Sequence, residues 1–277
     1  MASNARKYIG PWSASLVLLF LVIFPLFWMA LTSFKPDPEI FQTPPRLLPE
    51  NPTIEPYRLL FRFTNFENYL FNSFMVSFVS SVIGVGLALC GVYAMSRFRI
   101  MGGNIALFLI MFTYMLPRSL IIIPFYTLGN TVGLIDNLGY LTFLYVLVGF
   151  PFAVWLLRAY VETISITMEE AAMVDGATRF QAFYKVVVPQ AIPGMIATFV
   201  FIFVNAWNEL IFALVIISTD TKKTLTVGLS NLVSDTAVYS WALLSAGGVL
   251  ATLPILVIFF FVQRGMVTGI SLGSVKG

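Results

Sequence analysis

Residues 240–263 read SWALLSAGGVLATLPILVIFFFVQ and contain no charged side chain. A helix needs about 20 predominantly apolar residues to cross the hydrocarbon core of a bilayer, so this run predicts a membrane-spanning helix. Five further candidate spans lie near residues 12–34, 69–96, 104–128, 137–157 and 190–217. In the whole chain, 58% of the 277 residues are hydrophobic and 10% are charged, against roughly a quarter charged in a soluble domain. Because backbone polar groups in lipid must be satisfied internally, we predict an all-α integral membrane protein with about six transmembrane helices.

The third candidate span, near residues 104–128, is interrupted by Pro117, Arg118 and Pro124. Proline lacks a backbone donor and disturbs the interior of a helix. We therefore expect either a break in the helix at this point or a re-entrant stretch that follows it.

The distribution of Lys and Arg indicates the orientation of the spans. With the N-terminus inside, nine of these residues fall on the inner side of the membrane and six on the outer side. The positive-inside rule then predicts that both termini are cytoplasmic. Residues 35–68 and 218–239 become external loops of a single membrane domain, 1–277. Cys90, the only cysteine, is expected to be a buried spacer within an apolar run.

A cytoplasmic stretch between the fourth and fifth spans has the pattern of two short helices. It reads TMEEAAMVDGATRFQ from Thr167 to Gln181. Thr167 with Glu170, and Thr178 with Gln181, fit the capping-box pattern at a helix start, and Gly176 is placed to end the first helix in a left-handed turn. We predict a helix-turn-helix elbow.

The predicted elbow combines small residues with aromatic ones. Ala171, Ala172 and Ala177 are expected on its surface beside Phe180, Phe183 and Tyr184. Such a face suits docking of a short helix into a groove of a partner. From spacing alone, an apolar face that lies against lipid headgroups is an equally good interpretation.

The same stretch resembles the EAA loop of membrane subunits in bacterial ABC importers. The resemblance rests on Glu170-Ala171-Ala172, on Gly176 four residues later, and on Val186, Val188 and Pro189. It implies a type I ABC importer transmembrane domain whose loop, about residues 163–189, forms a coupling helix that docks on a cytoplasmic ATPase. The implied ATPase-coupling residues are Glu170, Ala171, Ala172, Asp175, Gly176, Ala177, Phe183 and Pro189.

Two further segments resemble the carbohydrate-type, maltose-permease-G-like group of this family. They are the C-terminal tail Gly269–Gly277 and the tripeptide Trp207-Asn208-Glu209 in the fifth span. In addition, Leu225, Gly228 and Leu229 lie where relatives carry a loop that reaches into the binding protein. The resemblance implies a permease subunit that imports a sugar across the cytoplasmic membrane of a bacterium or archaeon.

The implied partners are a second, homologous permease, two copies of a cytoplasmic ATPase, an extracytoplasmic solute-binding protein, the sugar and membrane lipid. No partner role for nucleic acid is expected, because Lys and Arg are spread over the loops. The chain has no G-x-x-x-x-G-K-[ST] phosphate loop, so ATP and Mg²⁺ are expected on the ATPase subunits. We expect no cofactor, metal or enzymatic activity on this chain itself.

A charged residue within the fifth candidate span indicates where solute passes. Glu209 lies there, and a carboxylate within a membrane is costly unless it faces protein, water or a partner. Asn205 and Glu209 are four residues apart and share one helix face, with Trp207 and Asn208 to either side, a mixture of groups that suits a sugar. The alternative is that Glu209 pairs with Arg118, or with the partner permease, and only fixes helix packing.

Two other classes of protein were considered. An ion-driven secondary transporter typically has two related halves and broken helices, and a chain of six spans without repeats would have to act as a dimer; that remains the alternative function. An intramembrane enzyme is disfavoured, because the chain has no histidine and neither an H-E-x-x-H nor a G-x-S-x-G pattern.

Overall fold

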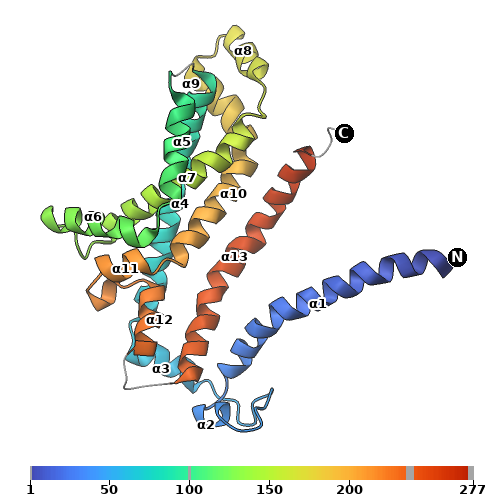
Figure 1. The fold of residues 1–277 in the computed structure, drawn as a ribbon, viewed down its shortest axis with the longest axis vertical. Helices are drawn as coiled ribbons and strands as arrows, with labels where there is room; N and C mark the ends of the chain where they lie inside the picture. Colours follow the sequence, from blue (N-terminus) through green and yellow to red (C-terminus); the bar gives the residue numbers. More distant parts are fainter. Residues whose placement is uncertain (1, 99–100, 235–239, 274–277) are drawn as a thin grey trace. The chain divides into compact units, whose positions relative to one another are not determined.

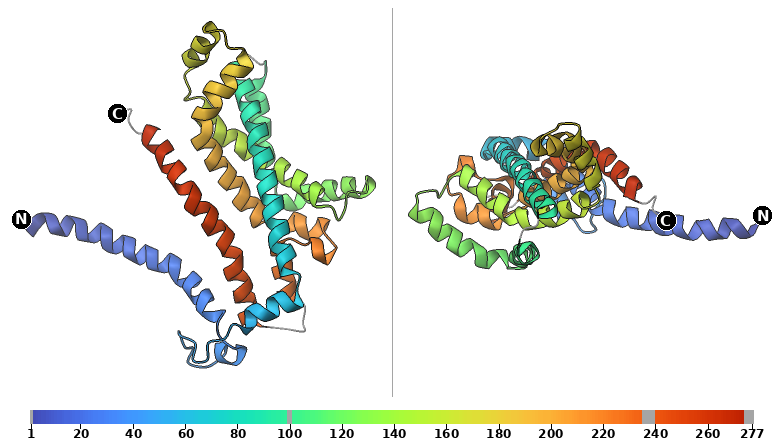
Figure 2. Two further views of the ribbon diagram at one scale, coloured as in Figure 1. Left: turned by 180° about the vertical axis from the view of Figure 1, so that it is seen from behind. Right: turned by 90° about the horizontal axis from the view of Figure 1, so that it is seen from above.

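The structure is a computed structural model that describes residues 2–98, 101–234 and 240–273. Within these ranges the chain is helical and contains no strand (Figure 1). It divides into two compact units. The first unit comprises Met1–Glu67 and Gly228–Pro254, and the second comprises Asn68–Val227 and Ile255–Gly277. Figure 2 shows the same helices from two further directions.

In the part of the chain that the structure describes, four helical segments are long and apolar enough to cross a membrane. They are Phe66–Arg97 (α4), Leu138–Val161 (α7), Arg179–Trp207, and Trp241–Gln263 within α13 (Trp241–Gly273). A bent pair, α5 (Gly103–Tyr114) and α6 (Arg118–Thr131), makes a fifth if the two helices form one span. Helix α1 (Ala2–Thr32) contributes a shorter apolar segment, Val17–Thr32. The all-helical membrane fold is confirmed, while the count of six spans remains a prediction.

The first unit gives structure to the predicted external loop, residues 35–68. That segment contains α2 (Asp37–Ile40) and α3 (Glu55–Phe63). The buried carboxylate of Glu39 accepts backbone hydrogen bonds from Glu50 and Asn51, and Asp37 accepts one from Ala242 near the start of α13. These bonds satisfy backbone donors that would otherwise remain unpaired in a loop.

The second unit is built around α4, α5, α7 and α10 (Val188–Trp207), whose buried side chains pack together, and α7 crosses α4 and α5 obliquely in Figure 1. Their shared core contains small and branched side chains: Val85, Ala88, Val92, Ala153, Leu157 and Ala191. Helices α7 and α10 come closest at Gly194, where an added Cβ would lie 2.5 Å from Cγ of Tyr160. Small residues at such contacts allow membrane helices to pack closely.

Cys90 is exposed, so the expectation that it is a buried spacer was wrong.

The third candidate span breaks at Met115–Pro117, and α5 and α6 meet there at an angle of 96°. Pro117 is the N-cap residue of α6. The residue before a proline avoids helical geometry and proline itself donates no hydrogen bond, so the chain turns here. The predicted interruption is confirmed.

The fifth candidate span is also broken. Helix α10 ends at Trp207, and after Asn208–Leu210 a new helix begins, α11 (Ile211–Ile216). A continuous helix over residues 190–217 was expected, so that expectation was wrong. As a result Glu209 lies in the break and does not share a helix face with Asn205.

Candidate functional site

The predicted elbow lies at one end of the second unit (Figure 1) and consists of α8 (Ile166–Val174) and α9 (Arg179–Ala182). Gly176 has a φ of +91°, the left-handed conformation expected after a helix end. Thr178 and Gln181 form the predicted capping box. The other predicted capping box was wrong, because α8 begins at Ile166 and Thr167 is already inside the helix.

The second limb of the elbow continues directly into a membrane-spanning helix. Between α9 and α10 the backbone forms one π-helical segment, Phe183–Val187. Pro189 follows this segment, and a proline ring clashes with the carbonyl four residues earlier in a regular helix, here that of Lys185. We attribute the wide turn to this proline. The second limb of the elbow and α10 therefore form one continuous helical segment of 29 residues, Arg179–Trp207.

Several apolar side chains in the elbow and just after it are exposed. Val174 is 86% exposed, Phe180 is 76% exposed and Tyr184 is 66% exposed. Of the sequence-predicted coupling residues, Glu170, Ala171, Asp175, Gly176 and Pro189 are exposed, whereas Ala172, Ala177 and Phe183 are half-buried. The ring centroid of Phe183 lies 4.5 Å from that of Tyr93 on α4, so Phe183 fastens the elbow to the bundle.

A buried ion pair, which the sequence did not indicate, joins α8 of the elbow to the end of α4. Nε of Arg97, the last residue of α4, lies 2.6 Å from Oε1 of Glu169 on α8, and the two side chains are 7% and 5% exposed. Arg97 also donates to the carbonyl oxygen of Ile164, at 2.9 Å. The two partners are 72 residues apart in the chain, and no local periodicity could have connected them.

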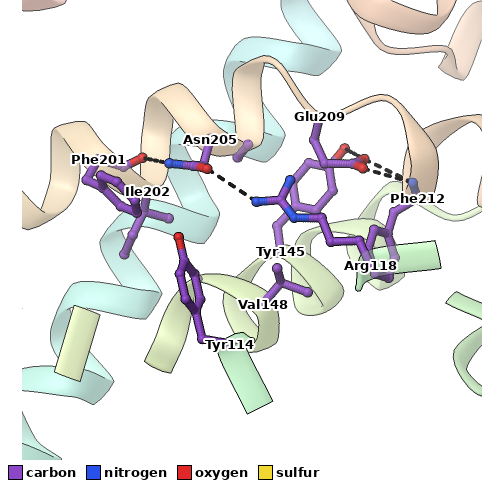
Figure 3. Close-up of a pocket in the computed structure, with 11 residues that line it drawn as sticks. Tyr114, Arg118, Tyr145, Val148, Phe201, Ile202, Asn205, Glu209 and Phe212 are labelled. Carbon is purple, nitrogen blue, oxygen red and sulfur yellow. Dashed lines mark hydrogen bonds between the residues drawn. The ribbon is translucent and has the colours of Figure 1, made fainter. Parts of the chain in front are cut away.

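A second polar cluster forms where the two broken spans meet (Figure 3). The carboxylate of Glu209 is 5% exposed. It accepts hydrogen bonds from the hydroxyl of Tyr145 at 2.9 Å and from the backbone N–H groups of Phe212 and Ala213 at 3.0 to 3.2 Å. These N–H groups lie in the first turn of α11, where no carbonyl oxygen of the same helix can accept their hydrogen bonds. Glu209 therefore caps α11 across the break.

Arg118 occupies the neighbouring position at the start of α6. Its guanidinium donates to the side-chain oxygen of Asn205 at 3.2 Å (Figure 3). Among the residues that the structure describes, no ion pair joins Arg118 to Glu209. Tyr145 and the start of α11 take the place that the packing interpretation of Glu209 gave to Arg118.

The predicted solute residues therefore separate into two groups. Trp207 is 3% exposed and its ring stacks on Phe203, so it belongs to the core along with Glu209. Asn205 is half-buried beside Arg118, and Asn208 is exposed. The cavity between Arg118, Asn205 and Tyr145 has a volume of about 20 Å³, which is room for a water molecule and not for a sugar ring.

The segment predicted to contact a binding protein is folded against the second unit at its start. The N–H of Leu225, which is buried, donates to Oγ of Ser73 on α4 at 2.7 Å. Helix α12 (Leu225–Ser234) also contains Gly228, which is buried, and Leu229, which is half-buried. Contact through these side chains would require α12 to move. The rest of the predicted loop, residues 235–239, and the end of the predicted C-terminal signature, residues 274–277, lie outside the described residues.

An ion pair and several hydrogen bonds join the loop between α6 and α7 to the segment that follows α11. The carboxylate of Asp136 accepts from Nζ of Lys222 at 2.8 Å, from the N–H and hydroxyl of Thr219 and from the N–H of Ser218. These donors, Lys222 first, hold the pKa of the Asp136 carboxyl well below its ordinary value. The α6–α7 loop is thereby fixed to the segment that follows α11.

This geometry defines a class of protein: a polytopic helical membrane protein with broken spans around buried charges and an elbow that exposes apolar side chains. Residues 80–271 match the family described as "Binding-protein-dependent transport system inner membrane component", and the chain belongs to that family. It is thus a multi-pass permease subunit of the ABC importer class, in which separate subunits hydrolyse ATP.

Individual relatives match over almost the whole chain. The chain is 36% identical to the inner membrane ABC transporter permease protein YcjP of Escherichia coli (strain K12) over 281 residues, covering 100% of each. It is 33% identical to the diacetylchitobiose uptake system permease protein DasC of Streptomyces coelicolor, covering 97% of each. A crystal structure of a bacterial ABC transporter involved in import of the acidic polysaccharide alginate contains a chain with a TM-score of 0.79 and 25% identity, covering 95% of this chain and 98% of that one.

Proposed function

We propose that this chain is the permease subunit of an importer for a sugar or related carbohydrate. The support is the family membership together with relatives whose names specify diacetylchitobiose uptake and alginate import. The single observation that carries the proposal is the elbow, whose EAA-like loop is held by the buried pair of Arg97 and Glu169 while Glu170 and Val174 remain exposed. An ion-driven transporter has no use for such an elbow.

The proposed assembly contains a second homologous permease, two copies of an ATPase that bind ATP and Mg²⁺, and an extracytoplasmic solute-binding protein. A second permease is consistent with the size of the cavity beside Arg118, about 20 Å³, which is too small for a sugar ring. In this proposal the sugar passes along a surface that the two permeases enclose together. The elbow and both termini are placed in the cytoplasm, and residues 1–277 act as one membrane domain.

The docking face is proposed to consist of Glu170, Ala171, Asp175 and Gly176, which are exposed, with Val174 and Phe180 beside them. Half-buried side chains support this docking face from beneath: Ala172, Ala177 and Phe183. Pro189, after the π-helical segment, sets the direction in which the chain continues from the elbow into α10.

The proposed solute surface is the half-buried pair Arg118 and Asn205, with exposed Asn208 nearby. A cation within the membrane costs at least a few kcal/mol unless it faces water, protein or a ligand. The one partner that the structure gives Arg118 is neutral, so its remaining donors are available for hydroxyl or acidic oxygens of a solute. Glu209 and Trp207 support this surface from behind and do not contact solute.

The docking face is tested by purifying tagged protein from native membranes and identifying what co-elutes. The parent is expected to bring an ATPase and a second permease. Glu170→Lys is expected to lose the ATPase and keep the permease, because it reverses an exposed charge on the docking face. Glu67→Lys, an exposed charge reversal in the first turn of α4, serves as the matched control. Recovery of the chain alone or as a homodimer, regardless of Glu170, would instead support an ion-driven transporter.

The solute surface is tested by uptake of a panel of labelled mono-, di- and oligosaccharides. Arg118→Gln removes the charge but keeps a donor to Asn205, so assembly is expected to persist while uptake falls about tenfold or more, corresponding to loss of about 1.4 kcal/mol. The matched variant Thr127→Val alters an exposed residue of α6 whose hydroxyl bonds only its own helix. Unchanged uptake by Arg118→Gln with every sugar that the parent imports would remove Arg118 from the solute path.

A further inference from the structure

Helix α4 is held at both of its ends by polar contacts from segments far away in the sequence. At one end, Arg97 binds Glu169 on α8 and the carbonyl of Ile164 just before α8. One guanidinium therefore contacts α8 itself and the chain that leads into it. Two bonds from a planar group fix the rotation of a short helix as well as its position.

The buried position of this pair determines what it can do. A buried ion pair adds little net stability, because both charges lose water, but it tolerates few alternative geometries. Glu169 lies on the buried face of α8 and the next residue, Glu170, lies on the exposed face. A displacement of the docking face at Glu170 therefore also displaces the neighbouring Glu169, which is bound to Arg97.

The other end of α4 contacts the segment that connects α11 to α12. Nδ2 of Asn72 donates to the backbone oxygens of both Thr221 and Lys223, at 3.0 Å each. Oγ of Ser73 accepts from the N–H of Leu225 at 2.7 Å. Asn72 and Ser73 are both buried. Because the bonds go to backbone groups, they fix the path of residues 221–225 whatever the side chains are.

Between these two ends α4 is suited to act as a stiff element. Asn72 and Arg97 are separated by about 38 Å along the helix axis. The helix runs without a break from Phe66 to Arg97 and contains no proline, whereas α7, α10 and the α5–α6 pair each contain one or a break. Proline, Gly/Ser pairs and π-bulges are the usual sites of sharp bending, and of these α4 has neither proline nor π-bulge but does contain Gly84, Gly86 and Gly91.

We propose that α4 is a connecting rod between the elbow and the segment 221–225. In this proposal, which rests on the proposed function, Arg97 and Glu169 join α8 to one end of the rod. Asn72 and Ser73 join the other end to the external segment that leads into α12. Displacement of α8 by the ATPase is passed on to the side where a binding protein docks. These four side chains are positioning residues and do not touch solute.

The test measures the external segment while the ATPase state is changed. In a Cys90→Ser background, Thr221→Cys places a reactive thiol on an exposed residue of that segment. The purified complex is labelled with a membrane-impermeant maleimide, with and without ATP and vanadate. In the parent complex, vanadate trapping is expected to change the labelling rate about fivefold or more, the lower end of typical coupling between distant sites.

Two variants interrupt the rod. The double variant Arg97→Gln with Glu169→Gln removes both charges together, which avoids leaving one buried charge unpaired. Asn72→Leu removes the bonds at the far end. In both, the ATPase is expected to co-elute and hydrolyse ATP as before, while the labelling rate no longer responds to trapping. Arg158→Gln, which breaks an exposed i,i+4 pair on α7, is expected to keep the full response.

The outcomes separate this proposal from the one on which it rests. If no ATPase co-elutes with the parent, the proposed function fails and the rod fails with it. If the ATPase co-elutes but trapping leaves the labelling rate of the parent unchanged, only the rod is overturned. The rod is also overturned if trapping changes the rate equally in the parent and in the double variant, or if the double variant loses the ATPase, since the pair would then only shape the docking face.

Discussion

Replacing Glu209 with Gln tests whether the buried carboxylate serves the fold or the solute. Its Oε2 atom accepts from Tyr145, Phe212 and Ala213, and Oε1 accepts from Phe212 alone. Gln keeps one oxygen and turns the other site into a donor. Phe212 can keep a bond, but the N–H of Ala213 loses its acceptor and the Tyr145 hydroxyl must turn away. An orphaned buried donor costs about 1–3 kcal/mol and a lost bond to a charged group about 1.5–3 kcal/mol, so we expect destabilisation of about 2.5–6 kcal/mol.

The assay is the apparent melting temperature of the purified complex, measured beside solute uptake per assembled complex. Glu209→Gln is expected to lower the melting temperature by roughly 5–24 °C at 2–4 °C per kcal/mol and to reduce the amount assembled. Uptake per assembled complex should change little. Tyr145→Phe, which removes one of the four bonds, should show a smaller loss of the same kind. A normal melting temperature with abolished uptake would refute this reasoning and return Glu209 to the solute path.

Three further outcomes are expected. Gly194→Ala places a methyl group against the ring of Tyr160 and should cost about 1–3 kcal/mol, while Gly86→Ala, where no atom lies within 4 Å, should leave the melting temperature unchanged or raise it. Asp136→Asn should lower the melting temperature at pH 7: the folded-state pKa is depressed, so the carboxylate stabilises above its unfolded pKa of about 4, and the difference from the parent should disappear as the pH falls through the folded-state pKa. Gly176→Ala, at a φ of +91°, should cost about 1–2 kcal/mol and loosen the elbow, measured as faster proteolysis between α8 and α9.

Apolar run length alone predicted most of the fold. The spans near 69–96 and 137–157 match α4 and α7 to within a few residues, because lipid leaves an uncharged run no alternative to a helix. The break after α10 was missed, since no proline or glycine marks it: residues 208–210 read Asn-Glu-Leu. What ends that helix is a tertiary interaction, the bonding of Glu209 to Tyr145 and to the start of α11.

Local sequence predicted parts of the candidate site that depend on local geometry and nothing more. Gly176 and the capping box of Thr178 with Gln181 were recognised because a left-handed turn and a helix start have short-range signatures. The ion pair of Arg97 with Glu169 was not, since each residue alone reads as a surface charge beside a membrane span. Only the packing of α8 under α4 makes the pair buried.

The two charges inside the candidate spans, Arg118 and Glu209, stand where those spans break. A break exposes backbone groups that lipid cannot satisfy, at several kcal/mol each, so a charge at that position either repairs the backbone or faces water. Glu209 repairs it, since three of its four hydrogen bonds come from backbone N–H groups at the start of α11. Arg118 instead donates to the neutral side chain of Asn205, and none of its hydrogen bonds in the structure satisfies a backbone group at the break. The hydrogen bonds therefore separate the two charges: those of Glu209 satisfy the start of α11, whereas that of Arg118 leaves donors for the solute role proposed above.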